Sequence, residues 1–199
     1  FYKEIFQWAK NKSLYIWVDE SQTFARTRQL FAFQHFGLDE YVDVVTIGKA
    51  LQACGTLFTE ELNPKPGLIA GTFNGSLASL RAGEKILKYL CEGPFYGGKG
   101  RAQQIEQAFL GKLNHLAKQS CRGLIKDARG IGTMISFQVC DGSRELTKKY
   151  LLKLFENGVI AFSAGAFPMR VRLLVPFSLK EEHIQEALGI IERTAKEVL

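Results

Sequence analysis

Short apolar runs that end in polar residues mark the first part of the chain. Residues 14–18 form one such run, which ends at Asp19, and residues 42–47 repeat the pattern and end at Gly48 and Lys49. Short apolar runs of this kind are typical of strands buried on both faces of a sheet. We therefore expect an open α/β sheet, in which ligands bind beyond the carboxyl ends of the strands.

Helical periodicity surrounds these strands. Residues 2–12 and residues 77–90 carry apolar side chains at helical spacing, and residues 56–59 are compatible with a third strand. A cluster of glycine and proline at residues 93–100 then interrupts the pattern, as expected at a domain boundary. We therefore predict a first domain over residues 1–96 and a second over residues 97–199.

The second domain mixes helices and strands in a different order. Its pattern predicts an α+β unit with its own core. The expected helices cover residues 101–119, 145–156 and 180–198, and the expected strands cover 159–162, 169–175 and two pieces within 123–139, on either side of Arg129-Gly130-Ile131-Gly132.

Composition narrows the function classes. The 199 residues are 46% hydrophobic with a net charge of +6, no apolar run is long enough to cross a bilayer, and the basic residues form no stripe. These features disfavour nucleic acid and membrane partners and favour an enzyme that handles anionic substrates and a phosphate-bearing cofactor. The four cysteines form no C-x-x-C pair and no histidine lies at metal-ligand spacing from them, so we expect reduced thiols in a cytoplasmic protein without a metal site.

Asp19 and Lys49 stand at the ends of the two predicted buried strands. By themselves, the acid is compatible with a helix cap or a sheet-edge group, and the lysine with a surface residue. However, a cation and an anion at neighbouring strand ends can serve one ligand. A desolvated lysine attacks carbonyls to form Schiff bases, and a carboxylate facing a pyridine nitrogen keeps that nitrogen protonated.

Five motifs follow one another along the chain. They are Val18-Asp19-Glu20-Ser21-Gln22-Thr23, residues 42–50 ending in Gly48-Lys49-Ala50, Gly71-Thr72-Phe73-Asn74-Gly75, Arg129-Gly130-Ile131-Gly132-Thr133-Met134 and Arg170-Val171-Arg172. In this order they resemble the pattern of class III aminotransferases, a family that uses pyridoxal 5'-phosphate (PLP). The resemblance covers nearly the whole chain, and it implies the C-terminal part of a PLP-binding large domain with a mostly parallel sheet, followed by a small α+β domain.

The resemblance implies a role for individual residues. Asp19 matches the acid that pairs with the pyridine nitrogen, and Gln22 matches the side chain that bonds the phenolic oxygen of the cofactor. Lys49 matches the lysine that carries the cofactor as a Schiff base and later moves the substrate proton. Thr72, otherwise a turn hydroxyl, matches the threonine that reaches the cofactor phosphate of a neighbouring subunit in a homodimer. Arg170 matches the arginine that forks onto a substrate carboxylate.

The sequence departs from the family pattern in two places. Ser21 replaces the valine or isoleucine that packs on one face of the cofactor ring, so we expect different packing there. The loop at residues 22–28 is one residue shorter than in the family and lacks its glycines, which predicts a different loop shape. On the last predicted strand, we expect Arg170 and Arg172 to face opposite sides, so that at most one meets the substrate.

The chain starts with Phe-Tyr-Lys-Glu and resembles the middle of a protein. In family members a preceding half supplies the loop that cradles the cofactor phosphate and an aromatic residue that stacks on the ring. We therefore expect that these residues alone would not be a stable active enzyme, because the cut sheet would expose an edge and an apolar face.

The resemblance implies transfer of an amino group to a 2-oxo acid such as 2-oxoglutarate. Gln52-Ala53-Cys54-Gly55 and the Arg170-x-Arg172 doublet resemble the lysine 6-aminotransferase and 4-aminobutyrate aminotransferase branch, with the acetylornithine and ornithine branch as the alternative. Two other hypotheses stay open: a different PLP reaction of the same fold type, such as that of a mutase or decarboxylase, or a relative without catalytic activity.

Overall fold

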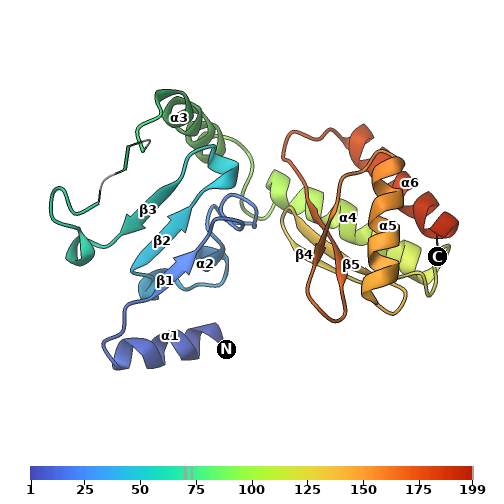
Figure 1. The fold of residues 1–199 in the computed structure, drawn as a ribbon, viewed down its shortest axis with the longest axis horizontal. Coiled ribbons are helices and arrows are strands. Elements are labelled where there is room, and N and C mark those ends of the chain that lie inside the picture. The colour runs from blue at the N-terminus through green and yellow to red at the C-terminus, as the bar shows by residue number, and fades with distance from the viewer. Residues whose placement is uncertain (70, 73, 199) are drawn as a thin grey trace. The chain divides into compact units, whose positions relative to one another are not determined.

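The computed structural model describes residues 1–69, 71–72 and 74–198 and divides into two compact units. The N-terminal unit is Phe1–Phe95 and the C-terminal unit is Tyr96–Leu199. Figure 1 shows the helices and strands of each unit.

A three-stranded sheet forms the centre of the N-terminal unit. Strand β1 (Trp17–Asp19) pairs in parallel with β2 (Val44–Ile47), and β2 pairs antiparallel with β3 (Gly55–Phe58). All three strands were expected from the sequence, although β1 is shorter than its apolar run. The helices of this unit are α1 (Tyr2–Asn11), α2 (Ala32–His35), α3 (Leu77–Glu92) and three short 3-10 helices, η1 (Asp39–Tyr41), η2 (Lys49–Leu51) and η3 (Glu60–Leu62).

The prediction that the first strand is buried on both faces is wrong for this chain. Val45 and Ile47 of β2 are buried, but Trp17 of β1 is 69% exposed, and Leu14 and Tyr15 before it are 49% and 55% exposed. Apolar periodicity reports which side chains avoid water, but it does not report which segment covers them. One face of this sheet is therefore open in the chain described here.

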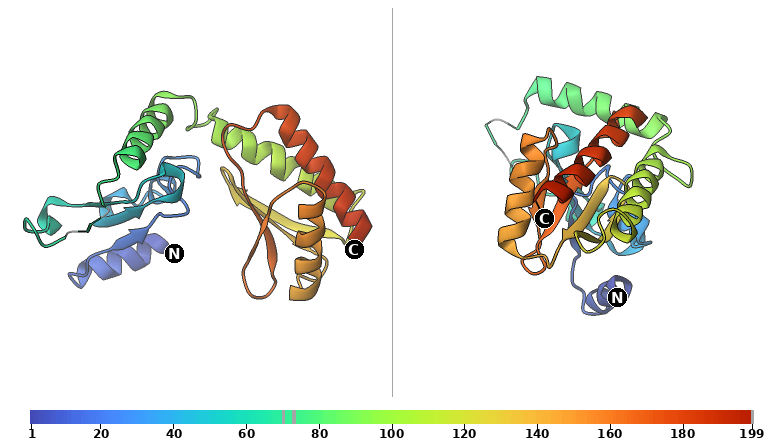
Figure 2. Two further views of the ribbon diagram at one scale, coloured as in Figure 1. Left: turned by 45° about the horizontal axis from the view of Figure 1, so that its top comes forward. Right: turned by 90° about the vertical axis from the view of Figure 1, so that its right-hand side faces the viewer.

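The C-terminal unit is a two-layer structure. Helices α4, α5 and α6 cover one face of a four-stranded sheet of order β4-β5-β7-β6, in which every neighbouring pair is antiparallel (Figures 1 and 2). The elements are α4 (Arg101–Lys118), β4 (Ile125–Ile131), β5 (Met134–Val139), α5 (Arg144–Glu156), β6 (Phe162–Ala164), β7 (Arg170–Leu174) and α6 (Glu181–Val198).

One apolar core joins these two layers. Phe137 and Val171 point from the sheet toward Phe109 of α4, Tyr150 of α5 and Leu188 of α6, and each of the five side chains is at most 2% exposed. The Tyr150 hydroxyl donates to the Ile191 carbonyl at 3.0 Å, so burial leaves this polar group satisfied. The C-terminal unit therefore has an apolar core of its own, formed by its helices and its sheet.

The order of elements in this unit follows the expectation, with one misplaced strand. The sequence favoured a strand at residues 159–162, whereas β6 starts only at Phe162. Ile160 is 70% exposed and lies before the strand. The β-branched and aromatic residues at 159–162 favoured a strand, but this composition alone did not locate its first residue.

The Arg129-Gly130-Ile131-Gly132 motif forms the end of β4 and the start of its turn into β5. A side chain on Gly130 would come within 2.4 Å of the Met134 carbonyl oxygen, so this close strand approach requires glycine. Gly132 has φ +60° and donates its N–H to the buried Glu106 carboxylate at 2.7 Å. These glycines therefore have a structural function in the hairpin.

A polar network on α6 predicts acid sensitivity. Glu192 accepts from Lys196 and Ser120, both at 2.7 Å, and these hydrogen bonds lower the pKa of Glu192 to about 2. Because the folded pKa lies below the ordinary value, the stabilisation is full above about pH 4.5 and is lost as the pH falls toward about 2. Glu192→Gln should therefore lower the free energy of unfolding by about 1 kcal/mol at pH 7.

Urea unfolding of the whole protein at pH 7 and at about pH 3 measures this difference, which should be smaller at the lower pH, between the ordinary and the folded pKa of Glu192. Glu186→Gln on the same helix is the matched control, because Glu186 is exposed and should change little at either pH. Equal losses for both variants would contradict the assigned role of the network.

Candidate active site

The predicted acid and lysine come together at neighbouring strand ends of the N-terminal unit. Asp19 is the last residue of β1 and lies beside Thr46 in the parallel register, three residues before Lys49. The charge of Lys49 is one of the influences that lower the pKa of Asp19. Both groups therefore stand at the carboxyl edge of the sheet, where ligands bind in open α/β folds.

Hydrogen bonds orient the Asp19 carboxylate. The Ser21 hydroxyl and backbone N–H, the latter at 2.8 Å, are the main causes that hold the pKa of Asp19 below its usual value. Thr46 donates to Asp19 Oδ1 at 3.3 Å and accepts from Trp17 Nε1 at 3.4 Å. Ser21, which was expected to change the packing on the cofactor ring, is a hydrogen-bond donor to Asp19 in this chain.

Sequence reasoning missed Thr46 as a supporting residue. The signal available was a single hydroxyl in the apolar strand Val44–Ile47, directly before the glycine and lysine. A threonine at that position is also common in strands for packing reasons, so its polarity alone does not reveal the contact.

The lowered pKa of Asp19 does not by itself identify a reactive group. Asp141 accepts the Ser143 N–H at 2.9 Å in the same Asp-x-Ser arrangement, and the Ser143 backbone and hydroxyl likewise lower the pKa of Asp141. What distinguishes Asp19 is its position beside Lys49 at the end of parallel strands.

Lys49 has an unusual backbone conformation. Its φ is +45°, a left-handed value that costs a residue other than glycine on the order of 1 kcal/mol. Gln52 fixes the turn, because its backbone N–H and its side-chain Nε2 donate to the Lys49 carbonyl at 3.0 and 3.1 Å. The side chain is exposed, and among the described residues the Lys49 amino group has no hydrogen-bond or ion-pair partner. The amino group is thus accessible to a ligand.

Glu20 organises the loop that follows Asp19. It is fully buried and accepts from the Thr23 hydroxyl and from the Phe33 N–H, the latter at 3.0 Å. Ala25, in the shortened segment, is buried with φ +62°. The loop therefore takes a left-handed turn without glycine, and it leaves Gln22 exposed near the strand end.

Thr72 lies elsewhere in the unit, in an exposed turn in which the Asn74 N–H donates to the Gly71 carbonyl at 3.2 Å. Phe73 of the same motif lies outside the described residues. Within the described part of the chain, no hydrogen bond or ion pair joins Thr72 to Asp19 or Lys49. This arrangement is compatible with the expected contact to another subunit, which remains a prediction.

Arg170 and Arg172 share one face of β7, and the prediction that they face opposite sides is wrong. Side chains alternate along a strand, so residues two positions apart point the same way. Val171 between them is buried in the core, whereas both arginines are half-buried on the outer face of the sheet. Orientation therefore does not select one of them as the substrate contact.

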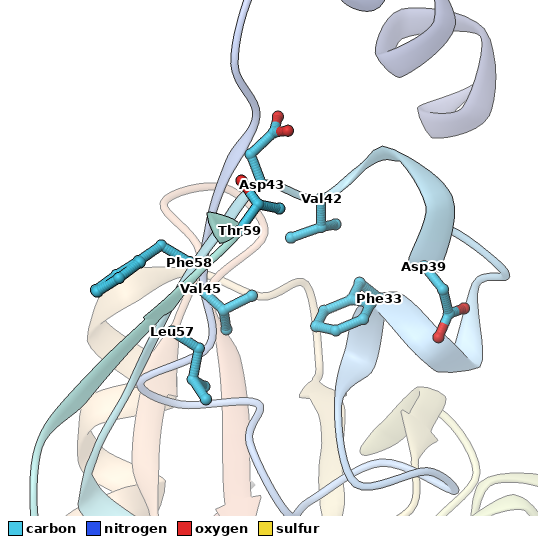
Figure 3. Close-up of a pocket in the computed structure, with 8 residues that line it drawn as sticks. All are labelled: Phe33, Asp39, Val42, Asp43, Val45, Leu57, Phe58 and Thr59. Atoms are coloured by element: carbon cyan, nitrogen blue, oxygen red, sulfur yellow. The ribbon is translucent and has the colours of Figure 1, made fainter. Parts of the chain in front are cut away.

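The N-terminal unit has a hollow of ≈ 220 Å³. Figure 3 shows the residues that line it. Val45 and Leu57 line it from β2 and β3, next to Phe33 and Val42. Val45 neighbours Thr46 on the strand, so it lies on the sheet face opposite Thr46 and Asp19. The hollow is mainly apolar and contains none of the predicted site residues, so it is a packing feature of the opposite face.

Comparison with known proteins decides the family. Residues 1–195 match the model of the family described as aminotransferase class-III. The chain belongs to the class III aminotransferases. Enzymes of this family depend on PLP, and the residues present fit that cofactor, because an ionised carboxylate and an accessible lysine meet at one sheet edge.

Class III relatives with different donors match this chain. It is 32% identical to the diaminobutyrate–2-oxoglutarate transaminase of Halomonas elongata over 86% of this chain and 41% of that protein. It is 30% identical to the 4-aminobutyrate aminotransferase of Mycobacterium leprae over 97% of this chain and 44% of that protein. The chain thus spans less than half the length of these relatives.

Solved structures support the fold of this class III chain. The lysine aminotransferase of M. tuberculosis in the internal aldimine form superposes with a TM-score of 0.85 at 23% identity, over 100% of this chain and 45% of that one. The ornithine aminotransferase of Plasmodium yoelii superposes with a TM-score of 0.79 at 25% identity, over 99% of this chain and 52% of that one.

The described residues contain no group of three or more histidine, cysteine or acidic residues placed to hold a metal ion. None of their helices combines the length and the apolar character that a membrane-spanning segment needs.

Proposed function

We propose that the whole protein to which these residues belong is a PLP-dependent aminotransferase that uses Lys49. It would move an ω-amino group from an amino-acid donor, such as lysine or 4-aminobutyrate, to a 2-oxo acid, with 2-oxoglutarate as the acceptor. The observation that carries the proposal is the meeting of Asp19 and Lys49 at parallel strand ends in a member of this family. An acetylornithine or ornithine donor is the alternative.

Each site residue has a proposed task. PLP, when bound, supplies an electron sink that stabilises negative charge on the substrate carbon. Asp19 would hold the pyridine nitrogen protonated, and Gln22 would donate to the phenolic oxygen. The Lys49 amino group would bind the cofactor and then accept and return the substrate proton. The Arg170 guanidinium would hold the substrate carboxylate.

The proposed assembly is a cytoplasmic homodimer with shared sites. In this proposal Thr72 of one subunit reaches the cofactor phosphate of the other, which agrees with its exposure and its position away from Asp19. Residues 1–96 would complete a PLP-binding large domain and residues 97–199 would form the small C-terminal domain.

The names of the similar relatives support an ω-amino donor. 2,4-Diaminobutyrate and 4-aminobutyrate both present an amino group distant from a carboxylate, and the name of the Halomonas enzyme includes 2-oxoglutarate as acceptor. The Gln52-Ala53-Cys54-Gly55 segment adds the resemblance to lysine 6-aminotransferases.

A donor panel tests the proposal. The whole protein with PLP is incubated with 2-oxoglutarate and with lysine, 4-aminobutyrate, 2,4-diaminobutyrate, ornithine or acetylornithine, and glutamate formation is measured. We expect lysine or 4-aminobutyrate to give the highest kcat/KM. A preference for acetylornithine or ornithine would select the alternative, and no glutamate from any donor would contradict aminotransferase activity with these substrates.

A further inference from the structure

A glycine stands in the interior of α3. Gly83 lies between Ala82 and Glu84 in this 16-residue helix, and it is buried. Glycine is less favourable than alanine in a helix interior, because it loses more conformational freedom when the helix forms. A glycine at a buried position of a helix therefore indicates a close packing contact that a side chain would prevent.

The contact that Gly83 makes is with the turn that carries Lys49. Helix α3 packs against η2. A Cβ atom on Gly83 would lie 3.3 Å from the Leu51 carbonyl oxygen and 3.4 Å from the Ala53 Cβ. These distances are tighter than ordinary van der Waals contact, so a larger residue would push the turn away by a few tenths of an ångström. Glycine thus allows α3 to lie directly against this turn.

The turn has a strained backbone that needs support from its surroundings. Lys49 and Gln52 both have left-handed values, with φ +45° and φ +60°. Left-handed residues other than glycine persist only where the neighbouring structure holds them in place. Inside the turn, the Leu51 N–H donates to the Gly48 carbonyl at 3.2 Å and Gln52 donates to the Lys49 carbonyl. From outside the turn, α3 supports it, because the buried Leu51 is the residue that meets Gly83.

A displacement of Leu51 is transmitted to Lys49. Both residues belong to η2, and the side chain of Lys49 starts from the backbone of this turn. The sheet fixes the chain only up to Ile47, which pairs with Gly55 of β3. The connection between these two residues is therefore held by its own hydrogen bonds and by its contact with α3.

We propose that Gly83 is a positioning residue for the Lys49 amino group. It acts through the backbone of the turn and not through contact with substrate or cofactor. The close approach of α3 keeps the amino group in a fixed place at the sheet edge beside Asp19. This inference rests on the proposed function, because it takes Lys49 as the reactive lysine. It goes beyond that function by giving a task to a helix that contains none of the five motifs.

Gly83→Ala in the whole protein tests this inference. A misplacement of about 1 Å can cost about 10²-fold in rate, so a shift of a few tenths of an ångström should lower kcat about 3- to 10-fold. The KM values should change little, because the contact to the substrate carboxylate is not altered. The melting temperature should stay close to that of wild type, because the gain in helix propensity offsets the crowding.

Hydrogen exchange followed by mass spectrometry gives a readout that does not depend on activity. The peptide that covers residues 48–55 contains the Leu51 and Gln52 N–H groups, which donate within the turn. We expect these groups to exchange about 3- to 10-fold faster in Gly83→Ala, because a turn displaced from its support opens more often.

Two further variants make the experiment specific to the contact. Gly111 lies in the interior of α4, and a Cβ on it would meet open space, so Gly111→Ala gains helix propensity without crowding. Its kcat and its exchange at residues 48–55 should equal those of wild type. Ala53→Gly removes the Cβ that the new side chain approaches, so the double variant with Gly83→Ala should have a higher kcat than Gly83→Ala alone.

The outcomes separate this inference from the function on which it rests. A wild-type kcat in Gly83→Ala, together with an inactive Lys49→Ala, overturns the inference and leaves the proposed function intact. A loss of kcat that Gly111→Ala shares, that Ala53→Gly does not relieve, or that comes without faster exchange at residues 48–55 overturns it as well. If Lys49→Ala keeps wild-type activity, or if the wild type forms no glutamate from any donor, both fail.

Discussion

Replacing Lys49 by alanine is expected to abolish amino transfer by the whole protein. Lys49 would both attach the cofactor and move the substrate proton, and general acid–base catalysis alone contributes up to about 10⁴-fold. We therefore expect kcat to fall by about 10⁴-fold or more, measured as glutamate formed from the best donor and 2-oxoglutarate.

Two control variants test whether this loss is due to the reactive amino group of Lys49. Lys12→Ala removes an exposed lysine after α1 and should leave kcat unchanged. Lys49→Arg keeps the positive charge but should be as inactive as Lys49→Ala, because a guanidinium does not give up its proton. A Lys49→Ala protein that keeps more than about one hundredth of the activity would show that another group performs the proton transfer.

Asp19→Asn is expected to give the second largest loss, about 10²- to 10³-fold in kcat, the size observed when one preorganised electrostatic contact is removed. The reason is that asparagine cannot hold a pyridine nitrogen protonated as a carboxylate can. Asparagine still offers an oxygen to the Ser21 N–H and to Thr46, and Asp19 is exposed, so the melting temperature should stay close to that of wild type.

The measurement is steady-state kinetics at saturating PLP, with Glu60→Gln as the matched control. Glu60 is an exposed acid of the same unit, in η3, and its replacement should not change kcat. Wild-type kcat in Asp19→Asn would exclude the proposed pairing of this carboxylate with the cofactor. A large fall in melting temperature would instead assign a structural role to Asp19.

Apolar periodicity and the positions of glycine and proline predicted most of the helices and strands, because these sequence signals are local. The helix over residues 77–90 appears as α3, and the strand at residues 42–47 appears as β2, because apolar spacing and turn residues report backbone conformation directly. Burial of Trp17 could not be predicted in the same way. It depends on which segment covers the sheet, and the sequence of the strand does not contain that information.

For the candidate site, the motifs located the residues but not their partners. Asp19 and Lys49 followed from two strand ends in one sheet. The Thr46 contact depends on strand register, and the contact between Asp127 and Arg170 joins residues 43 positions apart through a bulge. Neither register nor bulge has a sequence signal here, so these partners became visible only in three dimensions.

The role of the Arg170-x-Arg172 doublet shows where a family resemblance needs structure. The resemblance supplies a task for Arg170, whereas the structure shows an acid of the chain on the same guanidinium.

Chemical labelling tests most directly whether Lys49 carries the cofactor. The whole protein is incubated with PLP, reduced with borohydride so that the Schiff base becomes a stable bond, digested, and analysed by mass spectrometry. We predict that the phosphopyridoxyl group is found on the peptide that contains Lys49 and is absent in Lys49→Ala. A label on another lysine, or no label at all, would contradict the assignment of Lys49 as the cofactor-binding residue.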